Sequence, residues 1–276
     1  MINPLLINPK HETNKIINFL QKTFKEQKID KVVFGLSGGI DSMTVLYLLR
    51  EVFPAKNIYA VQMDYFPREK TTTDLKEVNF INISIKKIVE EFNKSIMKVK
   101  IPFLRQSLGA PFGVKRSKKT VSSFQYDNES KIRLGNIMVR VRMIMLFDLA
   151  KKLNAMVSGT ENKSERLLGY FTRFGDAASD IEPIAYLYKT QVLQLAKYLK
   201  VPQDIIDQSP TAGLWEGQTD EDEFGFTYKE ADQVLYLMDG RLQDINKIKS
   251  QFSNAEKIIK RVQANQFKLQ TPYHLK

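Results

Sequence analysis

The string Gly-Leu-Ser-Gly-Gly-Ile-Asp-Ser at residues 35–42 carries the clearest chemical signal in the chain. It lies between an apolar run at residues 31–36 and a segment with helical apolar spacing at residues 40–53. A glycine-rich turn between a buried strand and a helix directs backbone N–H groups toward an anion at the positive end of the helix. Phosphate is therefore the expected ligand of this turn. The expected donors are the amides of Ser37, Gly38 and Gly39 and the hydroxyls of Ser37 and Ser42.

The same string also contains an acid. It is not a Walker A loop, because no lysine follows Gly39 and Asp41 is found there instead. A bare carboxylate would repel a polyphosphate, so the reasonable task of Asp41 is to hold a Mg²⁺ ion that bridges phosphate oxygens. The alternative is a glycine-rich turn that only caps the following helix.

Two stretches resemble known families. Ser-Gly-Gly-x-Asp-Ser is similar to the pyrophosphatase loop of N-type ATP pyrophosphatases, which cleave ATP to AMP and pyrophosphate while activating an acid, an amide or a tRNA base. Residues 159–191 (GTENKSERLLGYFTRFGDAASDIEPIAYLYKTQ) closely resemble the signature of NAD synthetases. Shorter pieces at residues 135–142, 210–213 and 217–222 support this resemblance, which extends over most of the chain.

The resemblance implies an enzyme of the ligase class that forms a C–N bond. Such an enzyme uses ATP to adenylate the nicotinate carboxylate of deamido-NAD, and ammonia then replaces the adenylate to produce NAD⁺, AMP and pyrophosphate. Glutamine-using relatives carry an added amidase domain with a cysteine nucleophile, and this sequence has neither the length nor the cysteine. We therefore expect ammonia as the nitrogen source, ATP as co-substrate and Mg²⁺ as cofactor.

Carried over residue by residue, the resemblance implies three catalytic side chains, Asp41, Glu165 and Lys189, of which the two acids hold Mg²⁺. The implied ATP-binding residues are Gly35, Ser37, Gly38, Gly39, Ile40, Asp41, Ser42, Thr160, Lys189 and Thr211. The implied deamido-NAD-binding residues are Arg140, Tyr170, Phe171, Asp176 and Asp180. Position 173 carries arginine rather than lysine, so no contact is carried over there, and none is carried over at residues 64–67.

These assignments have simpler alternatives. Tyr170 and Phe171 have the residue types of core aromatics, and Arg140 could pair with a structural acid. Glu165 has the place of an acid that favours a helix N-terminus. Two rival functions are a tRNA-modifying pyrophosphatase, which residues 159–191 oppose, and a non-catalytic nucleotide sensor, which loss of either metal-binding acid would have indicated.

Composition narrows the class of protein further. The 276 residues contain no cysteine, which excludes disulfides, cysteine-bound metals and a cysteine nucleophile. The net charge of +11 attracts anions, but no run of five or six basic residues indicates a nucleic-acid tail. Neither a signal peptide nor an apolar run of about 18 residues is present. We therefore expect a cytoplasmic protein that binds neither nucleic acid nor membrane.

Strand and helix patterns alternate along the chain, which predicts a parallel β-sheet with helices on both faces and extra C-terminal helices. The expected strands are residues 31–36, 57–63, 78–85 and 155–158. The expected helices are residues 11–27, 40–53, 88–97, 134–153, 228–238, 242–252 and 254–264. The helix at 134–153 has apolar residues on nearly every face, which indicates deep burial or the interface of a homodimer.

We expect one domain, residues 1–276, with two irregular segments. Residues 98–131 form a basic excursion rich in loop-forming residues, and residues 207–227 form an acidic loop. Within them, residues 111–123 and 213–222 are the candidates for lids over the site.

Overall fold

The computed structural model describes residues 4–67, 75, 77–97, 128–215, 217–240, 243–270 and 273. Its central sheet has four parallel strands in the order β3-β2-β1-β4. The strands are β1 (Val32–Gly35), β2 (Ile58–Asp64), β3 (Asn79–Ser84) and β4 (Met156–Ser158). The chain moves from β1 outward to β3 and returns to the other side of β1 with β4. In open parallel sheets, such a change of direction leaves a crevice at the carboxyl ends of the strands.

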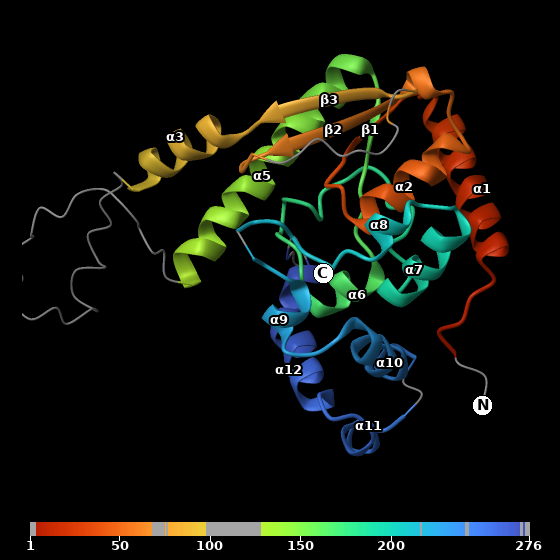
Figure 1. Cartoon of the computed structure of the whole chain (residues 1–276), viewed down its shortest axis with the longest axis vertical. Coiled ribbons are helices and arrows are strands. Elements are labelled where there is room, and N and C mark those ends of the chain that lie inside the picture. Colours follow the sequence, from red (N-terminus) through yellow and green to blue (C-terminus); the bar gives the residue numbers. More distant parts are fainter. Residues whose placement is uncertain are drawn as a thin grey trace, which may run out of the picture.

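Helices cover both faces of this sheet, as the sequence predicted (Figure 1). Neighbouring residues of a strand point to opposite faces, and both faces of β1 are fully buried. Val32 and Phe34 belong to the hydrophobic cluster of the face covered by α1 (Pro9–Gln27), α2 (Ile40–Arg50) and α7 (Lys189–Tyr198). Val33 belongs to the cluster of the opposite face, with α3 (Lys86–Met97) and α5 (Asn128–Leu153).

The long helix α5, for which the sequence predicted deep burial or a homodimer interface, is buried on one side and exposed on the other. Met138, Val141 and Leu146 are buried against the sheet, whereas Ile144 and Phe147 are 69% and 38% exposed. Residues 128–131 of the expected basic excursion form the start of this helix, while residues 98–127, including the lid candidate at 111–123, lie outside the described residues. No helix in the described part of the chain has the length and apolar character needed to cross a membrane.

Except for α8 (Gln203–Ile206), whose Ile205 packs into the cluster of α1, α2 and α7, the later helices form a C-terminal group beside the sheet (Figure 1). Its hydrophobic cluster joins Leu168, Phe224, Leu235 and Ile258. The elements of this half of the chain are α6 (Lys163–Leu168), α8 (Gln203–Ile206), α9 (Asp220–Phe224), α10 (Tyr228–Asp239), α11 (Ile245–Gln251), α12 (Ala255–Asn265) and η2 (Gln266–Leu269). A further short 3₁₀ helix, η1 (Ala55–Asn57), precedes β2.

Part of the acidic segment is helical rather than irregular. The short helix α9 begins after Thr219, whose side chain accepts a hydrogen bond from the amide of Asp222 at 3.2 Å. It ends at Gly225, whose φ of 71° is readily adopted only by glycine. The sequence reading missed this helix because it is only five residues long and contains four acids.

Candidate active site

The glycine-rich string forms the turn between β1 and α2, where phosphate binding was expected. Gly38 has a φ of 81°, a conformation that glycine adopts without strain. The Ser37 hydroxyl lies 3.0 Å from the Ser42 hydroxyl and accepts a hydrogen bond from the amide of Gly39 at 3.3 Å. Gly39 occupies the N-cap of α2, and no side chain caps this helix end. The first-turn amides of α2 are therefore available to an anion.

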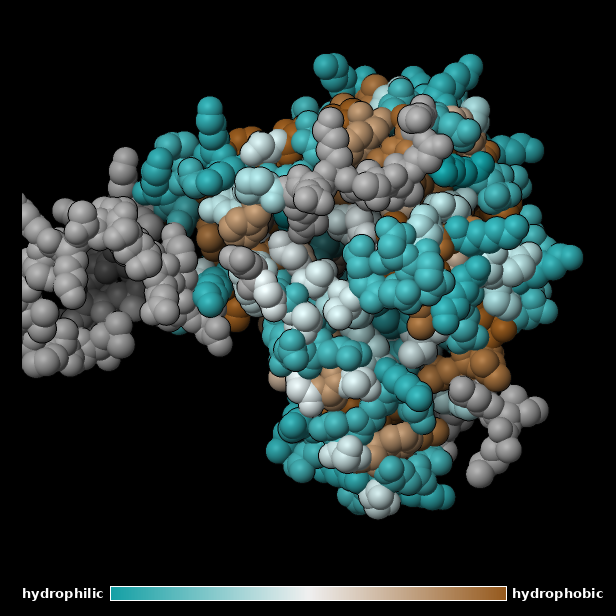
Figure 2. Space-filling model, in the orientation of Figure 1, coloured by the Kyte–Doolittle hydropathy of each residue, from teal (hydrophilic) through white to brown (hydrophobic). Residues whose placement is uncertain are grey.

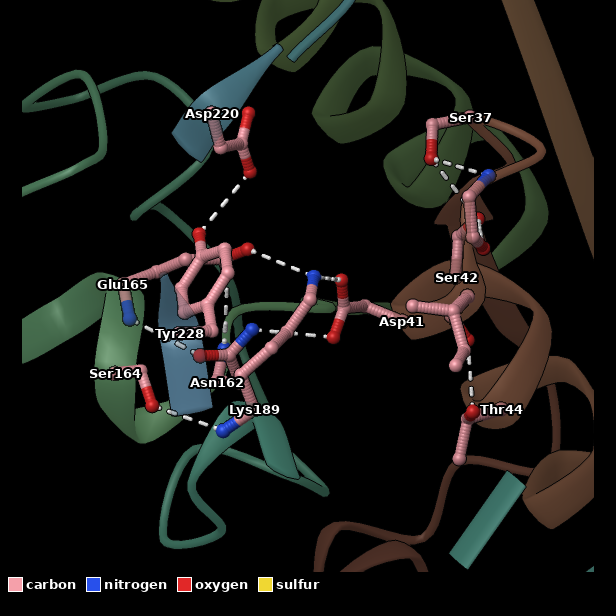
Figure 3. Close-up of polar contacts among 12 residues, drawn as sticks. Ser37, Asp41, Ser42, Thr44, Asn162, Ser164, Glu165, Lys189, Asp220 and Tyr228 are labelled. Carbon is pink, nitrogen blue, oxygen red and sulfur yellow. Dashed lines mark hydrogen bonds and ion pairs between the residues drawn. The ribbon is translucent and has the colours of Figure 1, made fainter. Parts of the chain in front are cut away.

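Asp41, Glu165 and Lys189 meet beside this turn, although they come from three helices (Figure 3). The Lys189 ammonium contacts Asp41 Oδ2 directly and lies 3.4 Å from Glu165 Oε1. The Lys189 side chain is 9% exposed, and those of Asp41 and Glu165 are 16% and 17% exposed. Asn162 donates its side-chain N–H to Asp41 Oδ1 at 3.1 Å. A phosphate loop, two acids and a cation thus share one corner of the molecule.

The electrostatics of this corner follow from burial and from the closeness of like charges. Burial, followed by the negative charge of Asp41, raises the pKa of Glu165 to about 8. Burial alone would lower the pKa of Lys189, but the charges of Asp41 and Glu165 outweigh it and the net shift is upward. Lys189 therefore stays protonated, and the two carboxyl groups share one buried positive charge.

A buried acid on another helix sets the positions of Glu165 and Lys189. Asp232 of α10 is fully buried and accepts hydrogen bonds from the hydroxyl of Ser164, which precedes Glu165. It also accepts from the amide and hydroxyl of Thr190, at 2.8 and 2.7 Å, directly after Lys189. The Ser164 hydroxyl lies 2.8 Å from the amide of Lys189, which donates to it. Asp232 thus anchors the first turns of α6 and α7 to each other.

These residues line a cavity of about 850 Å³ at the carboxyl edge of the sheet. Most of the residues singled out from the sequence lie on its wall. They are Gly35, Ser37, Gly38, Gly39, Ile40, Asp41, Thr160, Glu165, Tyr170, Phe171, Asp176, Lys189 and Thr211. Its size suits a nucleotide with part of a second substrate.

Three of the singled-out residues are not on the cavity wall. Ser42 is buried behind the loop, where its hydroxyl donates to the carbonyl of Gly39 at 3.0 Å. Arg140 lies on the exposed side of α5, and its Nε donates to the carbonyl of Arg173 at 3.2 Å. Asp180 accepts from the amide of Val157 at 2.7 Å and so holds the edge of β4.

Other wall residues were not singled out from the sequence. Arg261 of α12 lies over the ring of Phe224, 4.4 Å from its centroid, and Lys268 of η2 donates to the carbonyl of Gly169 at 2.6 Å. Both cations line the cavity and belong to the C-terminal group of helices. Their sequence context is an ordinary amphipathic helix and its end, which gives no motif by which to find them.

Two further acids, Glu161 and Glu182, belong to the block at residues 159–191. Burial, and then the charge of Glu182, raises the pKa of Glu161 to about 9. Burial raises the pKa of Glu182 to about 7, although Ser179 donates a hydrogen bond to it at 2.7 Å. Glu161 therefore carries a proton at neutral pH, because burial and the neighbouring carboxylates disfavour its charged form.

Comparisons with known proteins show the family and the fold. The sequence model of the NAD synthase family matches residues 12–272. An NH₃-dependent NAD synthetase of Fusobacterium nucleatum is 39% identical over 274 residues, covering 98% of this chain and 97% of that protein. The fold matches an NMN synthetase from Francisella tularensis with a TM-score of 0.75 and 30% identity, over 98% of this chain and 99% of the other. It matches an NH₃-dependent NAD synthetase from Campylobacter jejuni with a TM-score of 0.69 and 28% identity, over 98% and 100% of the two chains.

Proposed function

The chain belongs to the NAD synthase family, and on that premise we propose that its cavity joins ammonia to the nicotinate carboxylate of deamido-NAD at the expense of ATP. The observation that carries this proposal is the meeting of Asp41, Glu165 and Lys189 beside the open N-terminus of α2. Phosphates of ATP at that helix end would face the amides of the turn and the Lys189 ammonium together.

The reaction has two bond exchanges. A carboxylate oxygen of the nicotinate attacks the α-phosphorus of ATP, and the bond from that phosphorus to the bridging oxygen breaks to release pyrophosphate. Ammonia then attacks the carbonyl carbon of the acyl adenylate, AMP departs with the bond electrons, and the nitrogen loses a proton to give the amide. The turn amides and Lys189 would neutralise the charge that grows on the departing pyrophosphate. Tyr170 and Phe171 would bound the cavity around the nicotinate and exclude water from the adenylate.

Asp41 and Glu165 would hold the Mg²⁺ ion that phosphate chemistry of this kind requires. The two carboxyl groups, which now face the Lys189 ammonium, are a donor set that Mg²⁺ accepts. Phosphate oxygens and waters would be its other ligands. When bound, the ion supplies positive charge to the phosphates.

One assay tests this function. Purified protein receives ATP, Mg²⁺ and either deamido-NAD or nicotinate mononucleotide, with ammonium or glutamine, and AMP and amide products are followed. We expect NAD and AMP in equal amounts from deamido-NAD with ammonium, and no product from glutamine, because the chain has no cysteine to attack its amide. Preferred use of the mononucleotide would move the function to that of the Francisella tularensis relative. AMP formation that continues at the wild-type rate without Asp41 and without Glu165 would contradict the proposal.

We also propose that two copies of the chain associate through α3 and α5. These helices pack against each other, and each exposes apolar side chains. Ile88, Phe92 and Ile96 lie four residues apart on α3 and are 48%, 50% and 41% exposed. On α5, Ile144 and Phe147 are exposed in the same way. Figure 2 shows brown apolar residues scattered among teal hydrophilic ones over this part of the molecule, and exposed apolar side chains are common at interfaces between subunits.

A further inference from the structure

Asp220, the first residue of α9, is a buried acid with an unused oxygen. It is 3% exposed and lies on the cavity wall. Its amide donates to the carbonyl of Pro210 at 2.9 Å, and its Oδ2 accepts from the Tyr228 hydroxyl at 3.0 Å (Figure 3). Its Oδ1 is buried and has no hydrogen-bond partner among the described residues. A buried carboxylate oxygen left in this way is unfavourable, so a partner is expected to reach it in some state of the protein.

Two neighbours could reach that oxygen: the Tyr170 hydroxyl, which also interacts with Asp220, and Lys189, which is the cation whose charge acts on this carboxylate. The Lys189 ammonium lies 5.3 Å from the centroid of the Tyr228 ring, whose hydroxyl is bound to Asp220. Of the carboxylates in the described part of the chain, only those of Asp41 and Glu165 lie within 4.0 Å of the ammonium. Asp220 is therefore a neighbouring acid to which Lys189 is not paired in this state.

The proposed function, on which this inference rests, creates a conflict for Lys189. The oxygens of Asp41 and Glu165 that now face the ammonium are the ones that would bind Mg²⁺ with the phosphates. Lys189 is buried, and a buried ammonium that loses its anionic partners is strongly destabilised. It must therefore find other anions when the metal and nucleotide enter.

We propose that Lys189 exchanges partners when Mg²⁺ and ATP bind, leaving Asp41 and Glu165 for the phosphates and the free oxygen of Asp220. Asp220 is then a positioning residue: it holds the ammonium against the phosphates without touching substrate or metal. The exchange also connects the start of α9 to the nucleotide, so that the segment around residues 217–224 becomes more rigid when ATP is present.

Two other roles for Asp220 give different results. It could serve only to anchor Tyr228 through the hydrogen bond at Oδ2. It could also bind a cation directly, although the described residues offer no group of three acids for that purpose. The partner exchange predicts that the effect of Asp220 depends on Lys189, whereas the other two roles do not.

The test is a double-mutant cycle on nucleotide binding. Isothermal titration calorimetry measures the affinity of Mg²⁺ with α,β-methylene-ATP, which cannot be cleaved at the α-phosphorus, for wild type, Asp220→Asn, Lys189→Met and the double variant. We expect Asp220→Asn to weaken binding by about tenfold to a hundredfold, the scale of one charged hydrogen bond. In the Lys189→Met background the same change should have no further effect. Asp222→Asn, which removes an exposed acid from the same helix turn, should bind as wild type does.

Equal weakening by Asp220→Asn in both backgrounds, or no weakening in either, overturns the inference. Tyr228→Phe separates the anchoring role, because it removes the hydrogen bond to Oδ2 and keeps the ring. Partner exchange predicts affinity close to wild type for this variant, whereas anchoring predicts a loss as large as that of Asp220→Asn.

Hydrogen exchange of the wild-type protein keeps the inference testable even if Asp220→Asn fails to fold. Amides of residues 217–224 should gain protection when Mg²⁺ and the analogue bind, and this gain should vanish in Lys189→Met. Unchanged exchange in the wild type overturns the inference. If NAD formation from deamido-NAD is intact while these results are negative, only the partner exchange is wrong and the proposed function stands.

Discussion

Neutralising both carboxyl groups around Lys189 should destabilise the protein far more than neutralising either one. The variants are Asp41→Asn, Glu165→Gln and their combination, studied without nucleotide or metal. Burial and the charge of Asp41 disfavour the charged form of Glu165 and raise its pKa, so the two acids do not readily carry two negative charges at once. One negative charge therefore balances the Lys189 ammonium, and either acid can supply it.

The magnitude follows from the burial of Lys189. Each single variant leaves one acid, so its cost is that of an altered hydrogen bond, about 1 kcal/mol. The double variant leaves an ammonium that is 9% exposed without an anion. To become neutral at pH 7, a lysine with an ordinary pKa of about 10.4 must give up about 5 kcal/mol, at about 1.4 kcal/mol for each pH unit. The expected loss is therefore about 3–5 kcal/mol, as for other buried charges stripped of their partner.

Urea unfolding followed by circular dichroism measures these losses at pH 7. Adding Lys189→Met to the double variant should restore most of the stability, because it removes the unpaired charge and keeps an apolar side chain of similar length. Pyrophosphate release should behave in the opposite way: each single variant loses about a hundredfold and the double variant little more, because both remove one function. A double variant whose stability loss equals the sum of the single losses would refute the reasoning.

Three further predictions concern other parts of the molecule. Because the pKa of Glu161 is raised to about 9, the folded state holds a proton that the unfolded chain loses above pH 4.5, so the stability of the wild type falls as pH rises between these values. Glu161→Gln cannot titrate, so its stability relative to wild type should rise by at most about 1.4 kcal/mol per pH unit. Urea unfolding at pH 6 and 8 measures this difference. A difference that shrinks with pH would contradict this sign. Asp232→Ala should lower the free energy of unfolding by about 3 kcal/mol in the same assay and also lower activity, because three donors on α6 and α7 lose their acceptor. Unchanged activity of the fully folded variant would argue against a role of Asp232 in placing Glu165 and Lys189. Ile144→Lys should convert a dimer to a monomer in light scattering while the monomer stays folded, and a variant that still dimerises like wild type would exclude this face of α5.

Much of the fold could be predicted from the sequence because its signals are local. The strands around Val33 and Val61 read as short apolar runs, since both faces of the sheet are buried. The turn at Gly38 and Gly39 was recognisable because a positive φ and a close approach to an anion both favour glycine. The resemblance to the NAD synthetase family also came from contiguous residues, and the family match confirms it.

Residue type and order did not show which side chains meet. Asn162 was assigned no role from the sequence, yet it caps α6 and donates to Asp41. Asp220 was only one of several acids in the segment at residues 207–227. Arg140 and Asp180, assigned through the resemblance, lie off the cavity wall of this chain, and their role in binding stays a prediction.

The physical reason is that the wall of the cavity is assembled from segments distant in the sequence. The turn after β1, the first turns of α6 and α7, and the start of α9 reach one another only because the sheet order and the C-terminal helices bring them there. Local spacing determines the backbone of each segment, since it depends on neighbours along the chain. The pairing of Lys189 with two acids, the burial that shifts the pKa of Glu165, and the free oxygen of Asp220 depend on packing between segments, and only the tertiary structure decided them.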